Sequence, residues 1–120
     1  IDCDSKERKK LPIDAFDHLQ YNEKIAYFPD GYRKNKKEPV SPRAIKHLYD
    51  LKSITSTYRT IMCYVIQRED VKYFQPSVLD SFYRNAFYDA QKNGVEMHAV
   101  QFVWNELGEI SHINDNIEIL

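Results

Sequence analysis

The longest unbroken apolar run in the chain covers residues 61–66, IMCYVI. A strand that is apolar at every position is commonly covered on both faces, so this pattern predicts a central strand. Four polar or charged residues follow it at once, in the order Gln67, Arg68, Glu69 and Asp70. Because α/β proteins commonly place their sites at the ends of central strands, we expect the functional residues near this edge.

Two further stretches rich in apolar residues predict strands, at residues 25–28 and 95–104. The first stretch leads into residues 29–31, Pro-Asp-Gly, a sequence that favours a turn. The second follows a predicted helix. A strand, a helix and a strand of these lengths indicate a right-handed crossover, with residues 95–104 parallel to residues 61–66. Two stretches are expected to return antiparallel at the edge of the sheet, residues 109–112 and 117–120.

The stretch from residue 67 to residue 76 is expected to form a loop that leads toward the second helix. Tyr73 and Phe74 shortly precede Pro76 in this loop, and aromatic residues before a proline commonly pack as a loop anchor. The alternative is that these two rings stack on the bases of a single-stranded nucleic acid.

Two helices are predicted by apolar residues at helical spacing and by residues suited to helix ends. The first begins at Ser41, because serine can cap a helix and the proline that follows fits the first helical position. It extends to about residue 53. The second begins after Asp80, another good cap, and extends to about Asn93, with Gly94 just beyond its end. Together the elements predict an α/β fold with a mixed sheet flanked by helices.

The composition of the 120-residue chain indicates one domain with one hydrophobic core. Its 17 basic and 18 acidic residues nearly balance, so a surface for nucleic acid would have to come from local clusters of basic side chains. The two cysteines indicate neither a disulfide framework nor a zinc site, which favours a reducing, intracellular compartment. No apolar stretch is long enough to span a membrane, and no membrane partner is expected.

Residues 1–22 mix charged residues with a weak apolar pattern and are expected to be an irregular segment ahead of a domain at residues 23–120. The chain begins with isoleucine rather than methionine, so we expect a fragment, a processed product or a trimmed chain.

Several stretches that occur in one order along the chain resemble the C-terminal domain of the sugar fermentation stimulation protein (SfsA) family. They are FPD at residues 28–30, SPRAIKHLYDL at 41–51, VIQREDVKYFQP at 65–76, Asp80 followed by Tyr83, and AQKNGVEMHAV at 90–100. The resemblance implies an incomplete restriction-endonuclease-like, or PD-(D/E)xK, core and DNA binding. It also implies an OB-like N-terminal module that this chain lacks, and a protein partner is a further expectation.

The same resemblance implies a nuclease-like catalytic set, in which carboxylates hold Mg²⁺ and a lysine orients the attacking water. The set that fits is Glu23, Lys24 and Asp30, with Asp30 as the metal ligand. If Lys24 holds the lysine position, Asn22 stands where a carboxylate is expected, so the predicted site is degenerate. The alternative is that Asp30 is a turn residue between Pro29 and a glycine.

The candidate nucleic-acid-binding residues fall in a basic loop, on the first predicted helix and after the central strand. They are Arg33, Lys34, Lys36, Lys37, Arg43, Lys46, His47, Gln67 and Arg68. The helical members are spaced i, i+3 and i+4 near a helix N-terminus, which suits a phosphate. The alternatives are that the helical group is a solvated face and that Arg68 forms an ion pair with Asp70 that only fixes the loop.

The expected function is nucleic-acid binding, with DNA as the expected ligand, by an SfsA-like domain with a degenerate nuclease-like site. One alternative is a metal-dependent nuclease that missing segments or another chain complete. Another alternative is a non-catalytic interaction module in a larger assembly, which predicts an exposed apolar surface.

Overall fold

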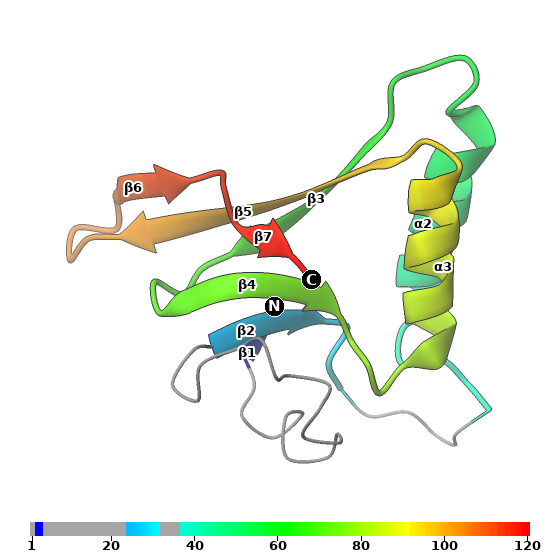
Figure 1. Cartoon of the computed structure of the whole chain (residues 1–120). Helices are drawn as coiled ribbons and strands as arrows, with labels where there is room; N and C mark the ends of the chain where they lie inside the picture. Colours follow the sequence, from blue (N-terminus) through cyan, green and yellow to red (C-terminus); the bar gives the residue numbers. More distant parts are fainter. Residues whose placement is uncertain (1, 4–23, 32–36) are drawn as a thin grey trace.

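The computed structural model describes residues 2–3, 24–31 and 37–120. In this part of the chain, strands gather beside a pair of helices (Figure 1). The elements are β1 (Asp2–Cys3), β2 (Lys24–Phe28), α2 (Pro42–Ile54), β3 (Ile61–Ile66), β4 (Val71–Pro76), α3 (Ser81–Lys92), β5 (Glu96–Trp104), β6 (Ile110–Asn114) and β7 (Glu118–Ile119). None of the helices in the described residues is long and apolar enough to cross a bilayer.

The strands form two sheets, with the orders β1-β2-β4-β7 and β3-β5-β6. Each sheet is mixed, because β2, β4 and β7 run parallel beside an antiparallel β1, and β3 and β5 run parallel beside an antiparallel β6. The α/β class with mixed pairing and flanking helices is therefore confirmed. The structure differs from the expectation in dividing the strands between two sheets.

The predicted central strand is an edge strand of its sheet in the described residues, and that prediction is wrong. β3 pairs with β5 alone, in the parallel arrangement that the crossover predicted. Its burial alternates, since Tyr64 and Ile66 are buried while Ile61 and Val65 are 43% and 38% exposed. An apolar residue at every position is thus not sufficient evidence of two covered faces, because an open sheet face can also carry apolar side chains.

The predicted loop at residues 67–76 contains a strand, β4, which lies in the middle of its sheet. Its ladder with β2 ends where Phe28 pairs with Pro76. Proline is tolerated there because it occupies the last position of the strand. Phe74 is completely buried in β4 rather than anchoring a loop. β6 returns antiparallel as predicted, whereas β7 pairs parallel with β4, contrary to the prediction.

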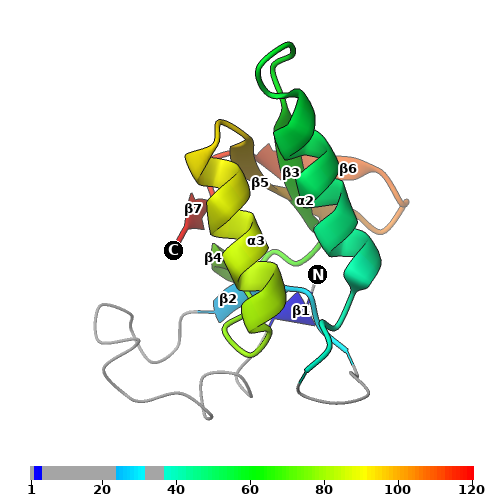
Figure 2. The ribbon, with the colours of Figure 1, turned by 90° about the vertical axis from the view of Figure 1, so that its right-hand side faces the viewer.

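Both helices begin and end close to the predicted residues and lie side by side on the same side of the strands (Figure 2). The Ser41 hydroxyl accepts a hydrogen bond from the main-chain N–H of Ala44 at the start of α2. The Asp80 carboxylate caps α3 by accepting from Tyr83 N–H, and it also accepts from Val40 N–H at 2.9 Å. Asp80 therefore ties the segment before α2 to the start of α3.

Tyr64 connects both sheets with the helical layer. Its ring stacks on Phe74 of β4 with the centroids 4.3 Å apart, and its hydroxyl forms a hydrogen bond with the hydroxyl of Tyr83 in α3. Burial raises the pKa of Tyr64 far above its ordinary value and raises the pKa of Tyr83 to about 12. Both hydroxyls thus keep their protons at neutral pH, so one can always donate to the other.

We predict that Phe87→Ala lowers the free energy of unfolding by about 3–5 kcal/mol, because Phe87 is completely buried in α3 and its removal leaves a cavity. Phe82→Ala is the matched control on the same helix, where the ring is 40% exposed, and its cost should stay below about 1 kcal/mol. Urea unfolding followed by circular dichroism measures both values. Equal losses for the two variants would contradict this assignment of the core.

Candidate functional site

The turn between β3 and β4 is fixed by a buried glutamine of β5. The side-chain amide of Gln101 donates to the main-chain carbonyl of Arg68 at 2.6 Å and to that of Val71 at 3.1 Å. Gln101 is only 5% exposed, so these two bonds satisfy a buried amide group. The turn that carries the predicted residues Gln67 and Arg68 is therefore held to the neighbouring sheet. Gln101 was not among the predicted site residues, although it is a polar side chain within the mainly apolar run at residues 99–104.

Two cations converge on the carboxylate of Asp70 at this turn. Lys24 Nζ lies 2.6 Å from Asp70 Oδ2, and the Arg68 guanidinium contacts both carboxylate oxygens, at 2.7 and 3.0 Å. β2 and β4 run parallel with Lys24 opposite Val71, which explains how residues 46 positions apart meet. Hydrogen bonds from Arg68 first, and from Lys24 next, lower the pKa of Asp70 to about 2. The three charges leave one net positive charge on half-exposed side chains.

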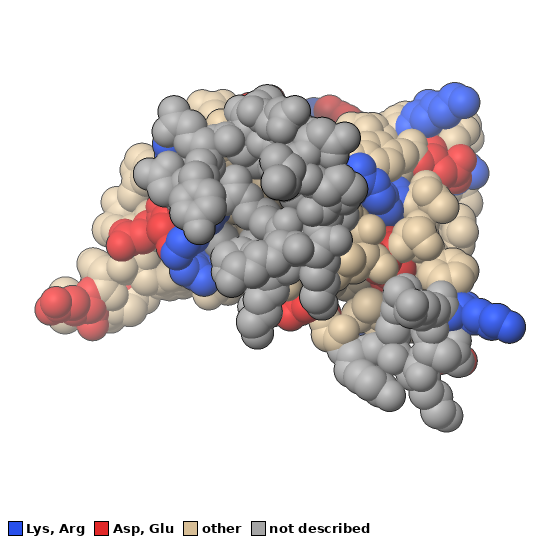
Figure 3. Space-filling view, turned by 60° about the horizontal axis from the view of Figure 1, so that its bottom comes forward, with Lys and Arg blue, Asp and Glu red and all other residues tan. Residues whose placement is uncertain are grey.

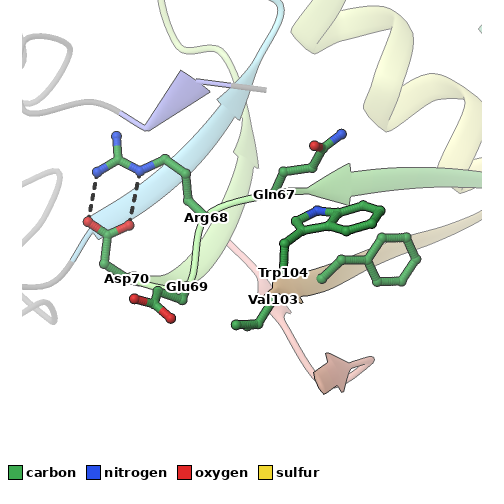
Figure 4. Close-up of a pocket in the computed structure, with 7 residues that line it drawn as sticks. Gln67, Arg68, Glu69, Asp70, Val103 and Trp104 are labelled. Atoms are coloured by element: carbon green, nitrogen blue, oxygen red, sulfur yellow. Dashed lines mark hydrogen bonds and ion pairs between the residues drawn. The ribbon is translucent and has the colours of Figure 1, made fainter. Parts of the chain in front are cut away.

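A hollow of about 320 Å³ opens between this turn and the end of β5 (Figure 4). It is lined by Gln67, Arg68, Glu69, Asp70, Phe102, Val103 and Trp104. Trp104 is 46% exposed, which leaves a large flat ring open to solvent beside the Gln67 amide, while the Arg68 guanidinium points to the other side of the turn (Figure 4). Sequence analysis missed Phe102 and Trp104, although Trp104 is the single tryptophan of the chain and lies at the end of a strand.

The predicted catalytic residues lie apart in the described structure. Lys24 begins β2 and pairs with Asp70, whereas Asp30 follows the other end of the same strand. Glu23 lies outside the described residues. No group of three or more His, Cys, Asp or Glu side chains that could hold a metal ion occurs among residues 2–3, 24–31 and 37–120.

The predicted phosphate-binding residues divide into two groups at opposite ends of the molecule. Arg43, Lys46 and His47 are exposed on α2, where Lys46 forms an i,i+4 ion pair with Asp50. Figure 1 shows the helices at one end and the β5–β6 hairpin, near the hollow, at the other. Lysine and arginine side chains project at the helical end, and acidic side chains gather at the hairpin tip (Figure 3). Of the basic loop, Lys37 is exposed, while Arg33, Lys34 and Lys36 lie outside the described residues.

Comparison with known proteins identifies relatives over most of the chain. A family model described as the sugar fermentation stimulation protein RE domain matches residues 17–108. A sugar fermentation stimulation protein homolog of Lawsonia intracellularis is 38% identical over 76 residues, covering 62% of this chain and 26% of the relative. A homolog from Synechocystis sp. is 32% identical over 103 residues, covering 85% of this chain and 40% of the relative. This chain thus spans less than half the length of these relatives.

The fold is also similar to a solved structure described as the structure of Pyrococcus furiosus SfsA in complex with Ca²⁺. The TM-score is 0.67 at 20% sequence identity, and the match covers 85% of this chain and 41% of that chain. The likeness shows a shared fold, in agreement with the nuclease-like α/β class expected from the sequence. Because the family model matches most of the chain, this protein belongs to the sugar fermentation stimulation protein family and carries its RE domain.

Proposed function

We propose that this domain binds nucleic acid at the hollow beside the β3–β4 turn and does not cleave it. The observation that carries the proposal is that Lys24 and Arg68 converge on the carboxylate of Asp70, and that Arg68 and Asp70 line the same hollow as the exposed Trp104. Cationic side chains that contact phosphates supply most of the affinity of such binding, and an aromatic ring can stack on a base. A site with both features suits a nucleic-acid strand.

The ion pairs at Asp70 hold the two cations in place and leave both able to bind another anion. The side chains of Lys24, Arg68 and Asp70 are 49%, 47% and 39% exposed, and ion pairs this exposed contribute only about 0–1 kcal/mol each. A phosphate can therefore replace Asp70 at small cost. Arg68 already presents two nitrogens to two oxygens, the geometry in which a guanidinium also binds a phosphate.

The proposal includes no metal-dependent step. The related Pyrococcus furiosus SfsA was solved in complex with Ca²⁺. Here the carboxylate nearest the predicted lysine, that of Asp70, is occupied by two cations, and the described residues supply no set of three metal ligands. The nuclease alternative would need donors from segments beyond the described residues or from another chain.

A second candidate function, an interaction module in a larger assembly, is favoured by the outer face of the β3-β5-β6 sheet. Ile61 and Val65 of β3 and Ile113 of β6 are exposed large apolar side chains on this sheet. Large apolar side chains that lie exposed on one sheet face are a feature of protein contacts.

We predict that Lys24→Ala with Arg68→Ala weakens binding of a labelled oligonucleotide by about tenfold or more, since each substitution removes a charge-assisted hydrogen bond to phosphate. A plot of the logarithm of the affinity against the logarithm of the salt concentration should become shallower, by about one unit of slope for each phosphate that is no longer neutralised. Fluorescence anisotropy at several salt concentrations measures both effects.

Arg59→Ala is the matched control for this titration, because Arg59 pairs with Glu96 at the other end of β3 as Arg68 pairs with Asp70. It should leave the affinity nearly unchanged. Arg43→Ala with Lys46→Ala tests the α2 group in the same assay. A weakening confined to the α2 variant would move the binding surface to the helices and contradict the proposal.

We predict that binding raises the pKa of Asp70. In the free domain the pKa of Asp70 is depressed, so its ion pairs with Arg68 and Lys24 are intact at any pH above the ordinary pKa of a carboxyl group. These ion pairs are lost as the pH falls toward about 2. A bound phosphate takes Arg68 and Lys24 away and adds a negative charge, and both effects raise the pKa. Carboxyl-carbon NMR titration with and without oligothymidylate measures the shift. Glu96 is the internal control, and an unchanged Asp70 in a saturated complex would place the strand elsewhere.

If the interaction module binds a second copy of itself through this sheet face, we predict that added sulfate strengthens the self-association, because such salts favour the burial of apolar surface. Val65→Lys should abolish it, since the variant places a charge on the exposed face. Sedimentation velocity over a range of protein concentrations measures the association. A monomer under all of these conditions would leave self-association without support.

A further inference from the structure

We infer that the hollow takes an unpaired base of a single strand, stacked on the ring of Trp104, so that the domain prefers single-stranded to duplex nucleic acid. The inference rests on the proposed function and specifies the form of its ligand. Trp104 ends β5 opposite Ile110 of β6, and almost half of its surface remains open to solvent. A large flat ring left exposed at the mouth of a hollow is a surface on which a base can stack.

The surroundings of Trp104 suit a base rather than another apolar side chain. Phe102 lies two positions earlier on the same strand and also lines the hollow, so a second ring is present on the wall. The side chain of Gln67 lies beside the Trp104 ring (Figure 4) and offers both a hydrogen-bond donor and an acceptor. The edge of a base carries donors and acceptors that such an amide can pair with.

The charges around the hollow determine along which of its sides the phosphates of a bound strand lie. Arg68 lies on the wall of the hollow together with the carboxylates of Glu69 and Asp70, and Lys24 joins it through Asp70, so the contacts to phosphate fall to these two cations. Glu106 and Glu109 lie in the turn that follows Trp104, where the acidic tip of the hairpin disfavours phosphate. A strand therefore passes on the β2 and β4 side of the hollow, with one base turned inward toward the ring.

Single strands fit this arrangement because their bases are free to turn. In a duplex each base is paired and stacked, and it would have to be flipped out before it could reach the Trp104 ring. The cations at Asp70 contact phosphates of either form equally. The preference for single strands must therefore come from the aromatic wall, and it should disappear when Trp104 is removed.

The single tryptophan of the chain makes its own fluorescence a reporter of stacking. Titration with oligothymidylate should quench the emission with the same midpoint that anisotropy gives, and a duplex of equal length should quench it far less. An abasic strand of the same length, which keeps the phosphates, should bind without quenching. Binding to all three strands with equal affinity and no quenching would overturn the stacking inference and leave the proposed function intact. No binding to any of them would overturn the proposed function itself.

Substitutions separate stacking from phosphate binding. Trp104→Ala should lower the affinity for oligothymidylate about tenfold or more and remove the preference for it over a duplex of equal length, whereas Trp104→Phe should keep most of the single-strand affinity. Tyr58→Ala is the matched control, because the Tyr58 ring is more exposed than that of Trp104 and lies shortly before the start of β3, at the end away from the β3–β4 turn. Unfolding curves confirm that each variant is folded. Equal weakening on both strands, or self-association abolished by Trp104→Ala without quenching by any strand, would overturn the inference.

Discussion

The buried contact between Tyr64, Phe74 and Tyr83 joins three parts of the molecule. Tyr64 belongs to one sheet, Phe74 to the other and Tyr83 to the helical layer, and their rings and hydroxyls meet where almost no solvent reaches. Two small sheets of three and four strands cannot each bury a sizeable core alone, so their shared aromatic interior holds them together. The relative position of all other elements depends on this junction.

One consequence is that chain segments far apart in the sequence meet at the β3–β4 turn. The turn leads from one sheet into the other, and Gln101 of β5 binds two of its carbonyl groups. The parallel pairing of β2 with β4 brings Lys24 to the same point. The cations, the amide and the aromatic wall of the hollow thus come from two strands and one turn, each positioned by main-chain pairing or by a buried side chain.

Asp70 accepts hydrogen bonds from two cations at this turn, which lowers its pKa and keeps its carboxylate ionised. The same arrangement keeps two basic side chains extended at the surface with little energetic cost to releasing them. The described residues of this member of the sugar fermentation stimulation protein family thus place two half-exposed cations around one carboxylate.

The sequence by itself determined the elements with local signals. Ser41 and Asp80 mark the helix starts because a cap acts within one turn, and Gly94 marks a helix end because its φ of 107° strongly favours glycine. Short motifs in a fixed order were also sufficient to identify the family. The parallel pairing of β3 with β5 was predicted from the long connection between them, because a strand that returns parallel needs a crossover of about a dozen residues or more.

Only the tertiary structure decided what those elements face. The apolar run of β3 could not reveal that one of its faces is open, because an apolar sequence does not show whether other elements cover the strand. The pairing of Lys24 with Asp70 could not be read from the chain, since it depends on the register between β2 and β4. The hollow at Trp104 could not be predicted for the same reason. Its lining comes from segments far apart in the sequence, and only the packing of the folded chain brings them together.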